Sequence, residues 1–129
     1  MGHPSRVGWT AWVVALALLG APVRAADTVL LRIMQVPLAG FQYHAGKILW
    51  DEMREGDVLT LAREPDNRHD PRAVRVEWRG VKLGYLPRGD NAQVAAAMDR
   101  GEGFSARIGR LASHPDPWKR VRVDVFLAL

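Results

Sequence analysis

The densest group of polar side chains in the sequence lies between two prolines, in the run Asp66-Asn67-Arg68-His69-Asp70. A calcium loop that started at Asp66 would place Arg68 at a ligand position and Pro71 where the loop needs glycine, which excludes that site. Asp and Asn side chains in loops commonly bond to nearby backbone groups. We therefore predict a loop of fixed shape over residues 64–72.

A transition-metal site is another interpretation of the same residues, with His44 joining Asp66, His69 and Asp70. Imidazole and carboxylate are ligands that such metals use, but this spacing matches no recognised metal motif. The chain has no cysteine, which excludes Cys-ligated zinc, iron–sulfur clusters, disulfides and a cysteine nucleophile. We expect no metal and no other cofactor, and a metal-dependent hydrolase is the weakest of three functional alternatives.

Other signatures of catalysis do not occur in the sequence. Ser5, Ser105 and Ser113 lie outside any G-x-S-x-G motif, and the glycines form no phosphate-binding loop. Carboxylate pairs such as Asp51 and Glu52 are common on solvated surfaces. We therefore predict a binding module without catalytic residues rather than an enzyme.

Aromatic rings and arginines favour a binding surface. Rings occur at Phe41, Tyr43, His44 and Tyr85. Six basic residues gather toward the C-terminus: Arg100, Arg107, Arg110, Lys119, Arg120 and Arg122. Small barrels hold single-stranded nucleic acid in this way, with phosphates on basic side chains and bases stacked on rings. Aromatic residues at strand spacing also commonly fill a core, so the rings alone do not decide.

Short strands must position these residues. Alternating or β-branched apolar runs predict six strands, over residues 28–36, 58–63, 73–78, 81–86, 104–111 and 120–127. Pro37 is expected to end the first strand, and Arg79-Gly80 to form a hairpin turn between the third and fourth. Residues 39–46 are expected to form a loop or a short strand.

One helix is expected over residues 91–100, with Asp90 as its N-cap and with Val94, Ala97 and Met98 facing inward. A shorter helical turn is expected over residues 47–54. The predicted fold class is therefore mainly β, a small six-stranded barrel or sandwich with one or two short helices.

Residues 1–25 are predicted to be a secretory signal peptide, which leaves residues 26–129 as the folded domain. Arg6 precedes an apolar run over residues 11–19, Pro22 interrupts it, and Val23-Arg24-Ala25 carries the small residues of a cleavage site. We expect cleavage after Ala25, export to the periplasm or beyond, and no stable membrane insertion afterwards. The alternative is a membrane anchor that stays uncleaved, because the uncharged stretch 7–23 is at the short limit for a span.

The sequence also resembles a known family. The run from Gly56 to Arg88, with Gly40–His44 upstream, is similar to the HIRAN domain. The elements that carry the resemblance are Gly56-Asp57, Arg63-Glu64-Pro65, Asn67, Asp70, Ala73-Val74 and Gly84-Tyr85-Leu86-Pro87. With the helix and the closing strands, the resemblance covers nearly all of residues 26–129.

The resemblance implies a six-stranded barrel similar to an OB fold that binds the 3′-hydroxyl end of single-stranded DNA. Together with the basic strand face, it indicates eight DNA-binding residues: Tyr43, His44, Asp66, Asn67, His69, Asp70, Tyr85 and Arg120. Tyr43 and His44 would stack on terminal bases, and Asn67 and Asp70 would contact the terminal sugar hydroxyl. Broad descriptions of the family also mention zinc binding and acid-anhydride hydrolysis, for which this chain has no motif.

Three residues depart from the family pattern. His44 stands where a second tyrosine is expected, Arg68 replaces a usual proline and Arg72 a common asparagine. A secretory signal would also separate the protein from replication forks, where helicase-fused relatives act. An exported envelope module with a ligand other than nucleic acid is therefore the second functional alternative.

Overall fold

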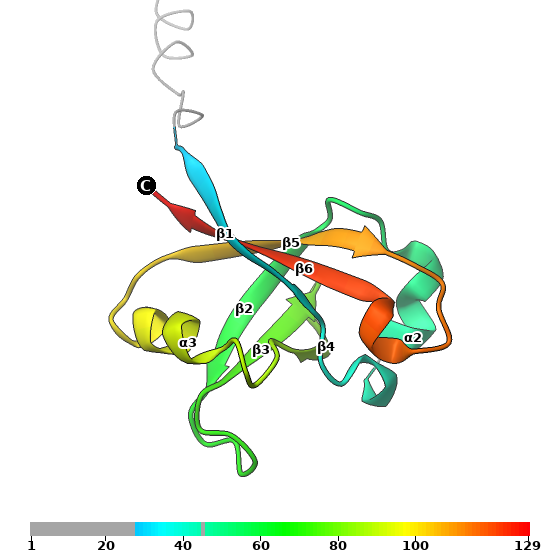
Figure 1. Ribbon diagram of the computed structural model, residues 1–129, viewed down its shortest axis with the longest axis horizontal. Coiled ribbons are helices and arrows are strands. Elements are labelled where there is room, and N and C mark those ends of the chain that lie inside the picture. Colours follow the sequence, from blue (N-terminus) through cyan, green and yellow to red (C-terminus); the bar gives the residue numbers. More distant parts are fainter. Residues whose placement is uncertain (1–27, 45) are drawn as a thin grey trace, which may run out of the picture.

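Six antiparallel strands form the sheet of the computed structural model, which describes residues 28–44 and 46–129 (Figure 1). The strands are β1 (Leu30–Pro37), β2 (Val58–Glu64), β3 (Ala73–Trp78), β4 (Val81–Tyr85), β5 (Phe104–Leu111) and β6 (Val121–Ala128). They are hydrogen-bonded in the order β1-β6-β5-β2-β3-β4. The predicted mainly β class with six strands is confirmed; β3 and β5 have the expected bounds, and the ends of the other strands differ from the expected ones by at most two residues.

The hairpin of β3 and β4 shows how the sequence pattern produces the sheet. Val74, Val76 and Trp78 are buried on one face of β3, while the residues between them are only partly buried. Arg79 and Gly80 both have positive φ angles, 49° and 78°, as the type I′ turn that matches the twist of paired strands requires. The predicted hairpin is confirmed.

A short β-bridge between Ala39 and Tyr85 connects β1 and β4, the two outer strands of the sheet. Just beyond β1, Ala39 exchanges two backbone hydrogen bonds of 2.9 Å with Tyr85 at the end of β4. The strands meet closely here, because a Cβ atom at Gly84 would lie 2.2 Å from the carbonyl oxygen of Ala39. This seam closes the sheet into a barrel, consistent with the expected OB-like architecture.

The helical elements cover the ends of the barrel. They are η2 (Phe41–Tyr43), α2 (Gly46–Leu49), η3 (Trp50–Glu52), α3 (Ala92–Asp99) and η4 (Pro117–Lys119). The helical turn predicted over residues 47–54 corresponds to α2 and η3, and η2 lies where a loop or short strand was expected. In α3, Val94 and Ala97 are buried and Met98 packs against the core as predicted.

The expectation that Asp90 caps α3 is wrong. The backbone N–H of Asp90 donates to the carbonyl of Pro87 (2.9 Å), so Asp90 belongs to the preceding turn. Asn91 holds the cap position, but its side chain makes no capping bond and instead donates to Asp70 in the loop that joins β2 to β3. Tertiary contacts thus override the local capping preference.

Two further expectations concern the beginning of the chain. Pro37 was expected to end the first strand before it, yet β1 includes Pro37, which is tolerated because β1 lies at an end of the strand order. The predicted signal peptide lies outside the described residues. Within residues 28–44 and 46–129, no helix is long and apolar enough to cross a membrane.

Candidate nucleic-acid interface

A groove of about 570 Å³ lies between the segment after β1, strand β4 and the loop that joins β2 to β3. Its lining, here called the ring groove, consists of Ala39, Tyr43, His44, Asn67, His69, Asp70, Ala73, Lys82, Tyr85, Leu86 and Arg88. Six of the eight residues predicted to bind DNA are among them. The chain therefore brings residues together that are more than forty positions apart in the sequence.

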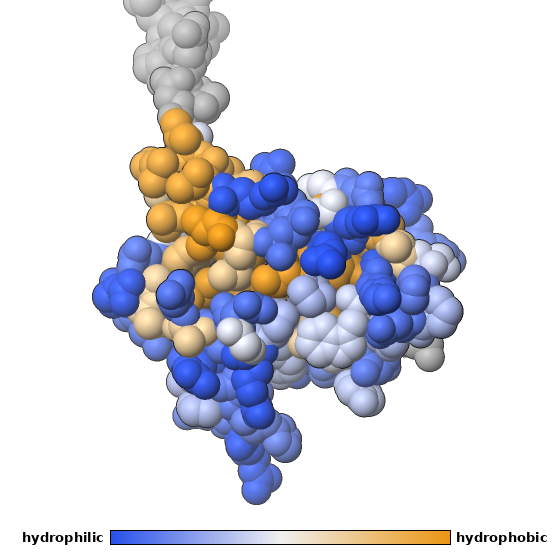
Figure 2. Space-filling model, in the orientation of Figure 1, coloured by the Kyte–Doolittle hydropathy of each residue, from blue (hydrophilic) through white to orange (hydrophobic). Residues whose placement is uncertain are grey.

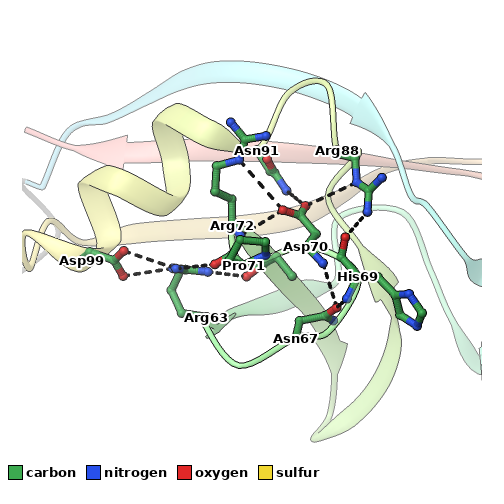
Figure 3. A network of polar contacts seen from close by, with 10 residues as sticks. Arg63, Asn67, His69, Asp70, Pro71, Arg72, Arg88, Asn91 and Asp99 are labelled. Carbon is green, nitrogen blue, oxygen red and sulfur yellow. Dashed lines mark hydrogen bonds and ion pairs between the residues drawn. The ribbon is translucent and has the colours of Figure 1, made fainter.

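Asn67 fixes the shape of the β2–β3 loop (Figure 3). Its Oδ1 accepts the backbone N–H groups of His69 (2.9 Å) and Asp70 (3.1 Å). Its Nδ2 donates to Oε1 of Glu64 at 2.9 Å. The prediction that this loop is fixed by its own Asn and Asp side chains is confirmed, and both lone pairs of the Asn67 oxygen are occupied.

Asp70 connects the loop to the helix α3. Its Oδ1 accepts the backbone N–H of Arg72 (2.9 Å), and its Oδ2 accepts the side-chain amide of the buried Asn91 (2.7 Å). The Nε atoms of Arg72 and Arg88 each lie 3.9 Å from the carboxylate. The hydrogen bonds from the Arg72 backbone and from Asn91, followed by these two cations, lower the pKa of Asp70, so it is a carboxylate at neutral pH.

Arg63 provides a second connection between the loop and α3 (Figure 3). Its guanidinium donates to the backbone carbonyls of Ala73 (2.7 Å) and Pro71 (3.0 Å) and to Oδ1 of Asp99 (3.0 Å). Asn91 and Asp99 lie at opposite ends of α3, so the loop is attached to the helix at two separate points. This double attachment keeps the loop wall of the ring groove in place.

Glu64 lies beneath the groove and accepts bonds from three sides. Its Oε1 accepts the hydroxyl of Tyr85 (2.9 Å) as well as Asn67, and its Oε2 accepts Nη1 of Arg75 (2.8 Å). Partial burial alone would raise the pKa of Glu64, but the hydrogen bonds from Asn67, Tyr85 and Arg75 outweigh it and lower that pKa. One carboxylate thus positions both the loop and the Tyr85 ring.

Three rings form the opposite wall. Tyr43 is 78% exposed, whereas His44 meets Tyr85 edge to face with 6.0 Å between ring centroids. Burial, followed by the nearby charge of Lys82, lowers the pKa of His44, which leaves the imidazole neutral at pH 7. A neutral imidazole next to an exposed phenol is a surface on which a nucleobase can stack.

Two cations of the groove were missed by the sequence interpretation. Nζ of Lys82 lies 4.6 Å from the centroid of the Tyr85 ring, within cation–π distance. Arg88 has a side chain that is 66% exposed, and its guanidinium donates to the backbone carbonyl of His69. Both residues lie next to the segment Gly84-Tyr85-Leu86-Pro87, which carries the family resemblance. Their closeness to that segment was the signal in the sequence that could have identified them as groove residues.

Two of the eight predicted DNA-binding residues lie outside the groove, and one ring that was suggested for the binding surface is buried. Asp66 is exposed on the same loop but does not line the groove. Arg120 lines a separate pocket beside Trp50, and its guanidinium donates to the backbone carbonyls of His114 (2.6 Å) and Pro115 (3.2 Å). Phe41, proposed as a flat ring, is only 1% exposed because it packs in the core, so it offers no binding surface.

The metal interpretation finds no support in the geometry. Among the described residues, no three His, Cys, Asp or Glu side chains lie close enough together to hold an ion. Each carboxylate oxygen of Asp70, one of the suggested ligands, already accepts a hydrogen bond, and the Nε atoms of Arg72 and Arg88 lie 3.9 Å away, which disfavours a metal cation there. The described residues therefore give no support to the zinc mentioned in broad descriptions of the family.

The sequence model of the HIRAN domain family matches residues 31–129 of this chain. The chain belongs to the HIRAN family. Its fold is similar to the crystal structure of a protein from Lactobacillus plantarum, with a TM-score of 0.68 and 24% identity over 79% of this chain and 98% of that one. It is also similar to the HIRAN domain of human HLTF, with a TM-score of 0.59 and 17% identity over 81% of this chain and 79% of that one.

A curated relative gives a narrower match. The chain is 42% identical over 53 residues to a Fanconi-associated nuclease 1 homolog from rice, Oryza sativa subsp. japonica. That match covers 38% of this chain but only 6% of the nuclease, so it concerns one small part of a much larger protein. Membership of the HIRAN family supports a DNA-binding module, and the recognition of the HIRAN pattern in the sequence is confirmed.

Proposed function

We propose that this HIRAN domain binds the 3′-hydroxyl end of single-stranded DNA in the ring groove, without catalysis. The observation that carries the proposal is the composition of that one groove. It combines exposed or half-buried rings for stacking, two cations for phosphates, and a fixed carboxylate beside them. Rings and cations together are the means by which small barrels hold single strands, and the carboxylate adds an acceptor for a terminal hydroxyl.

The geometry suggests a role for each wall. A terminal base stacks on Tyr43, and the preceding phosphate lies near Arg88 and Lys82. The 3′-hydroxyl donates to the carboxylate of Asp70. Each oxygen of Asp70 accepts one hydrogen bond within the protein, which leaves acceptor capacity for one more donor.

A carboxylate at this position selects against a strand that ends in a phosphate. A 3′-phosphate would remove the donated hydrogen bond and place negative charge near Asp70. Arg72 and Arg88, each 3.9 Å from the carboxylate, offset part of that repulsion. We expect a preference for the hydroxyl of about tenfold in affinity, or about 1.4 kcal/mol.

Fluorescence anisotropy at fixed salt tests this preference. The full chain is titrated with two short single strands that differ only in a 3′-hydroxyl or a 3′-phosphate. Tighter binding of the hydroxyl strand supports the proposal. Equal binding would contradict the proposed recognition of the 3′-hydroxyl and would mean that the groove binds anions in general. Absence of binding at tens of micromolar for both strands would overturn the proposal and favour a ligand other than nucleic acid.

Asp70→Asn is the informative variant, because it removes the charge and preserves the size. Oδ1 of the buried Asn91 makes no hydrogen bond. A flip of the Asn91 amide therefore supplies an acceptor for the new amide at position 70. The variant should stay folded and lose the preference for the hydroxyl, while Trp118→Ala, at an exposed ring outside the groove, should keep it.

A further inference from the structure

One end of the barrel exposes a group of large apolar side chains. The apolar tip consists of Val29 (59% exposed), Leu30 (41%), Leu31 (51%), Ile33 (40%) and the C-terminal Leu129 (73%). Figure 2 shows these side chains as a continuous hydrophobic area over the beginning of β1, on a surface that is otherwise mainly hydrophilic. Contiguous apolar area of this kind commonly marks a contact surface.

The apolar tip is exposed on both faces of its strand. Neighbouring residues of a strand point to opposite faces, yet Leu30 and Leu31 are both exposed. Their backbone pairs with Ala128 and Leu127 of β6, so the strand itself is formed. A strand with one buried and one hydrated face would alternate instead, as β3 does.

The tip continues into a groove beside α3. This groove has a volume of about 390 Å³ and runs from Ile33 and Met34 to Val94, Ala97, Phe104 and Leu127. Arg100 also lines it, with a side chain that is 65% exposed, and Arg32 lies within the tip at 56% exposure. Both guanidinium groups are accessible, and their carboxylate partners, Glu102 at 2.7 Å from Arg100 and Asp124 at 3.8 Å from Arg32, form surface ion pairs that contribute little and can exchange for another anion.

The position of the tip in the chain indicates what covers it. The apolar run over residues 11–19 ends ten residues before Val29, a separation of at most about 35 Å even for a fully extended chain. Arg24 lies between the two. In a chain that keeps this run as an uncleaved anchor, the alternative to a cleaved signal peptide, a segment suited to a bilayer precedes a folded surface that is apolar and flanked by arginines.

We propose that the apolar tip docks into the interface of an anionic lipid bilayer, with Arg32 and Arg100 at the level of the headgroups. Amphipathic surfaces bind there through buried apolar area combined with attraction to anionic lipids. A second copy of the chain that added a strand beside β1 would extend the sheet sideways and leave both apolar faces in water. A lipid interface surrounds the strand and covers both faces.

Docking in this way would hold the ring groove away from the bilayer. The groove residue Ala39 lies just beyond the far end of β1, whose eight residues span about 26 Å. The tip and the groove therefore lie at opposite ends of one strand. A membrane-bound domain would present the groove to the aqueous phase.

Single-cysteine labelling tests the docking, because the natural chain has no cysteine. Lipid association alone is not an adequate readout, since residues 7–23 are apolar enough to bind vesicles themselves. The full-length variant Leu31→Cys is treated with a water-soluble thiol reagent, with and without vesicles containing about one-third phosphatidylglycerol. Ile48→Cys, at a position 86% exposed on α2, is the matched control.

We expect vesicles to slow the labelling of Leu31→Cys about tenfold and to leave Ile48→Cys unchanged, because only the tip enters the interface. Unchanged labelling at position 31 would overturn the proposal. Equal protection at both positions would also overturn it, because it would indicate adsorption without a preferred surface. Protection at position 31 that grows with protein concentration in the absence of lipid would assign the tip to self-association instead.

Discussion

The two walls of the ring groove are held in place in different ways. On the loop wall, Asn67 and Asp70 accept or donate five hydrogen bonds within the protein and connect to α3. On the ring wall, Tyr43 is 78% exposed, and Nζ of Lys82 lies 4.6 Å from the centroid of the Tyr85 ring. One wall is rigid and largely saturated, and the other is accessible.

This difference separates positioning from contact. A side chain whose polar atoms are bonded within the protein contributes chiefly by fixing its neighbours, and its loss exposes unpaired partners. An accessible ring or cation contributes directly to a ligand, and its loss leaves the fold unchanged. Stability should therefore respond chiefly to the loop wall and overall affinity chiefly to the ring wall, while Asp70 on the loop wall is also expected to set the preference for the hydroxyl.

The largest expected effect is on stability, at Asp70. Asp70→Ala should lower the free energy of unfolding by about 2–3 kcal/mol, because the buried amide of Asn91 and the Arg72 backbone lose their acceptor. Denaturation by urea measures the change. Asp70→Asn should lower the free energy of unfolding much less. Wild-type stability in Asp70→Ala would show that the hydrogen bonds of Asp70 do not hold the loop in place, and would break the distinction between the walls.

Tyr43 should show the opposite behaviour. Tyr43→Ala should weaken the binding of a short single strand by about 1–3 kcal/mol, the usual contribution of one stacked base, and leave the unfolding curve unchanged. Anisotropy and urea denaturation on the same samples separate the two quantities. Tyr43→Phe, which keeps the ring, should bind as the natural chain does; a loss as large as that of Ala would indicate a role for the hydroxyl instead of stacking.

Arg88 should have a moderate effect on binding alone. Arg88→Gln should weaken binding by about 1 kcal/mol and reduce the slope of log affinity against log salt by about one. Arg110, exposed on β5 and absent from the groove lining, offers the matched control: Arg110→Gln should not change the binding of a strand too short to reach it. Equal effects of the two variants would contradict a localised site.

The smallest effect should appear as a pH dependence at Glu64. The pKa of Glu64 is lowered in the folded protein, so its contribution is present above its unfolded pKa and disappears as the pH falls through the folded pKa. Glu64→Gln should therefore be less stable than the natural chain at pH 7, by about 1 kcal/mol. The difference should shrink below about pH 4. A difference that stays constant between pH 7 and pH 3 would show that the charge of Glu64 is not what matters.

The strands were predictable because their information is local. Val74, Val76 and Trp78 alternate along the chain as they do in the sheet, and Arg79-Gly80 marks the turn. Asn91 was not predictable, because its role depends on a partner 21 positions away. The capping preference that pointed to Asp90 carries no information about that partner.

The candidate site was predictable where the HIRAN pattern is specific. Asn67, Asp70 and Tyr85 lie in that pattern and line the groove. Arg120 was chosen from a count of basic residues, which does not say which way a side chain points, and it binds the carbonyls of its own loop. Phe41 shows the same limit for rings, since a core and a binding surface use the same residue types.

The seam between Ala39 and Tyr85 links the integrity of the barrel to its capacity to bind. The same two residues close the sheet and line the groove, so opening the seam dismantles the site. By thermodynamic linkage, a ligand that binds only the closed form stabilises that form by an amount that grows with the logarithm of the ligand concentration above its Kd. Closure of the barrel and binding of a ligand are then energetically coupled, so that each favours the other.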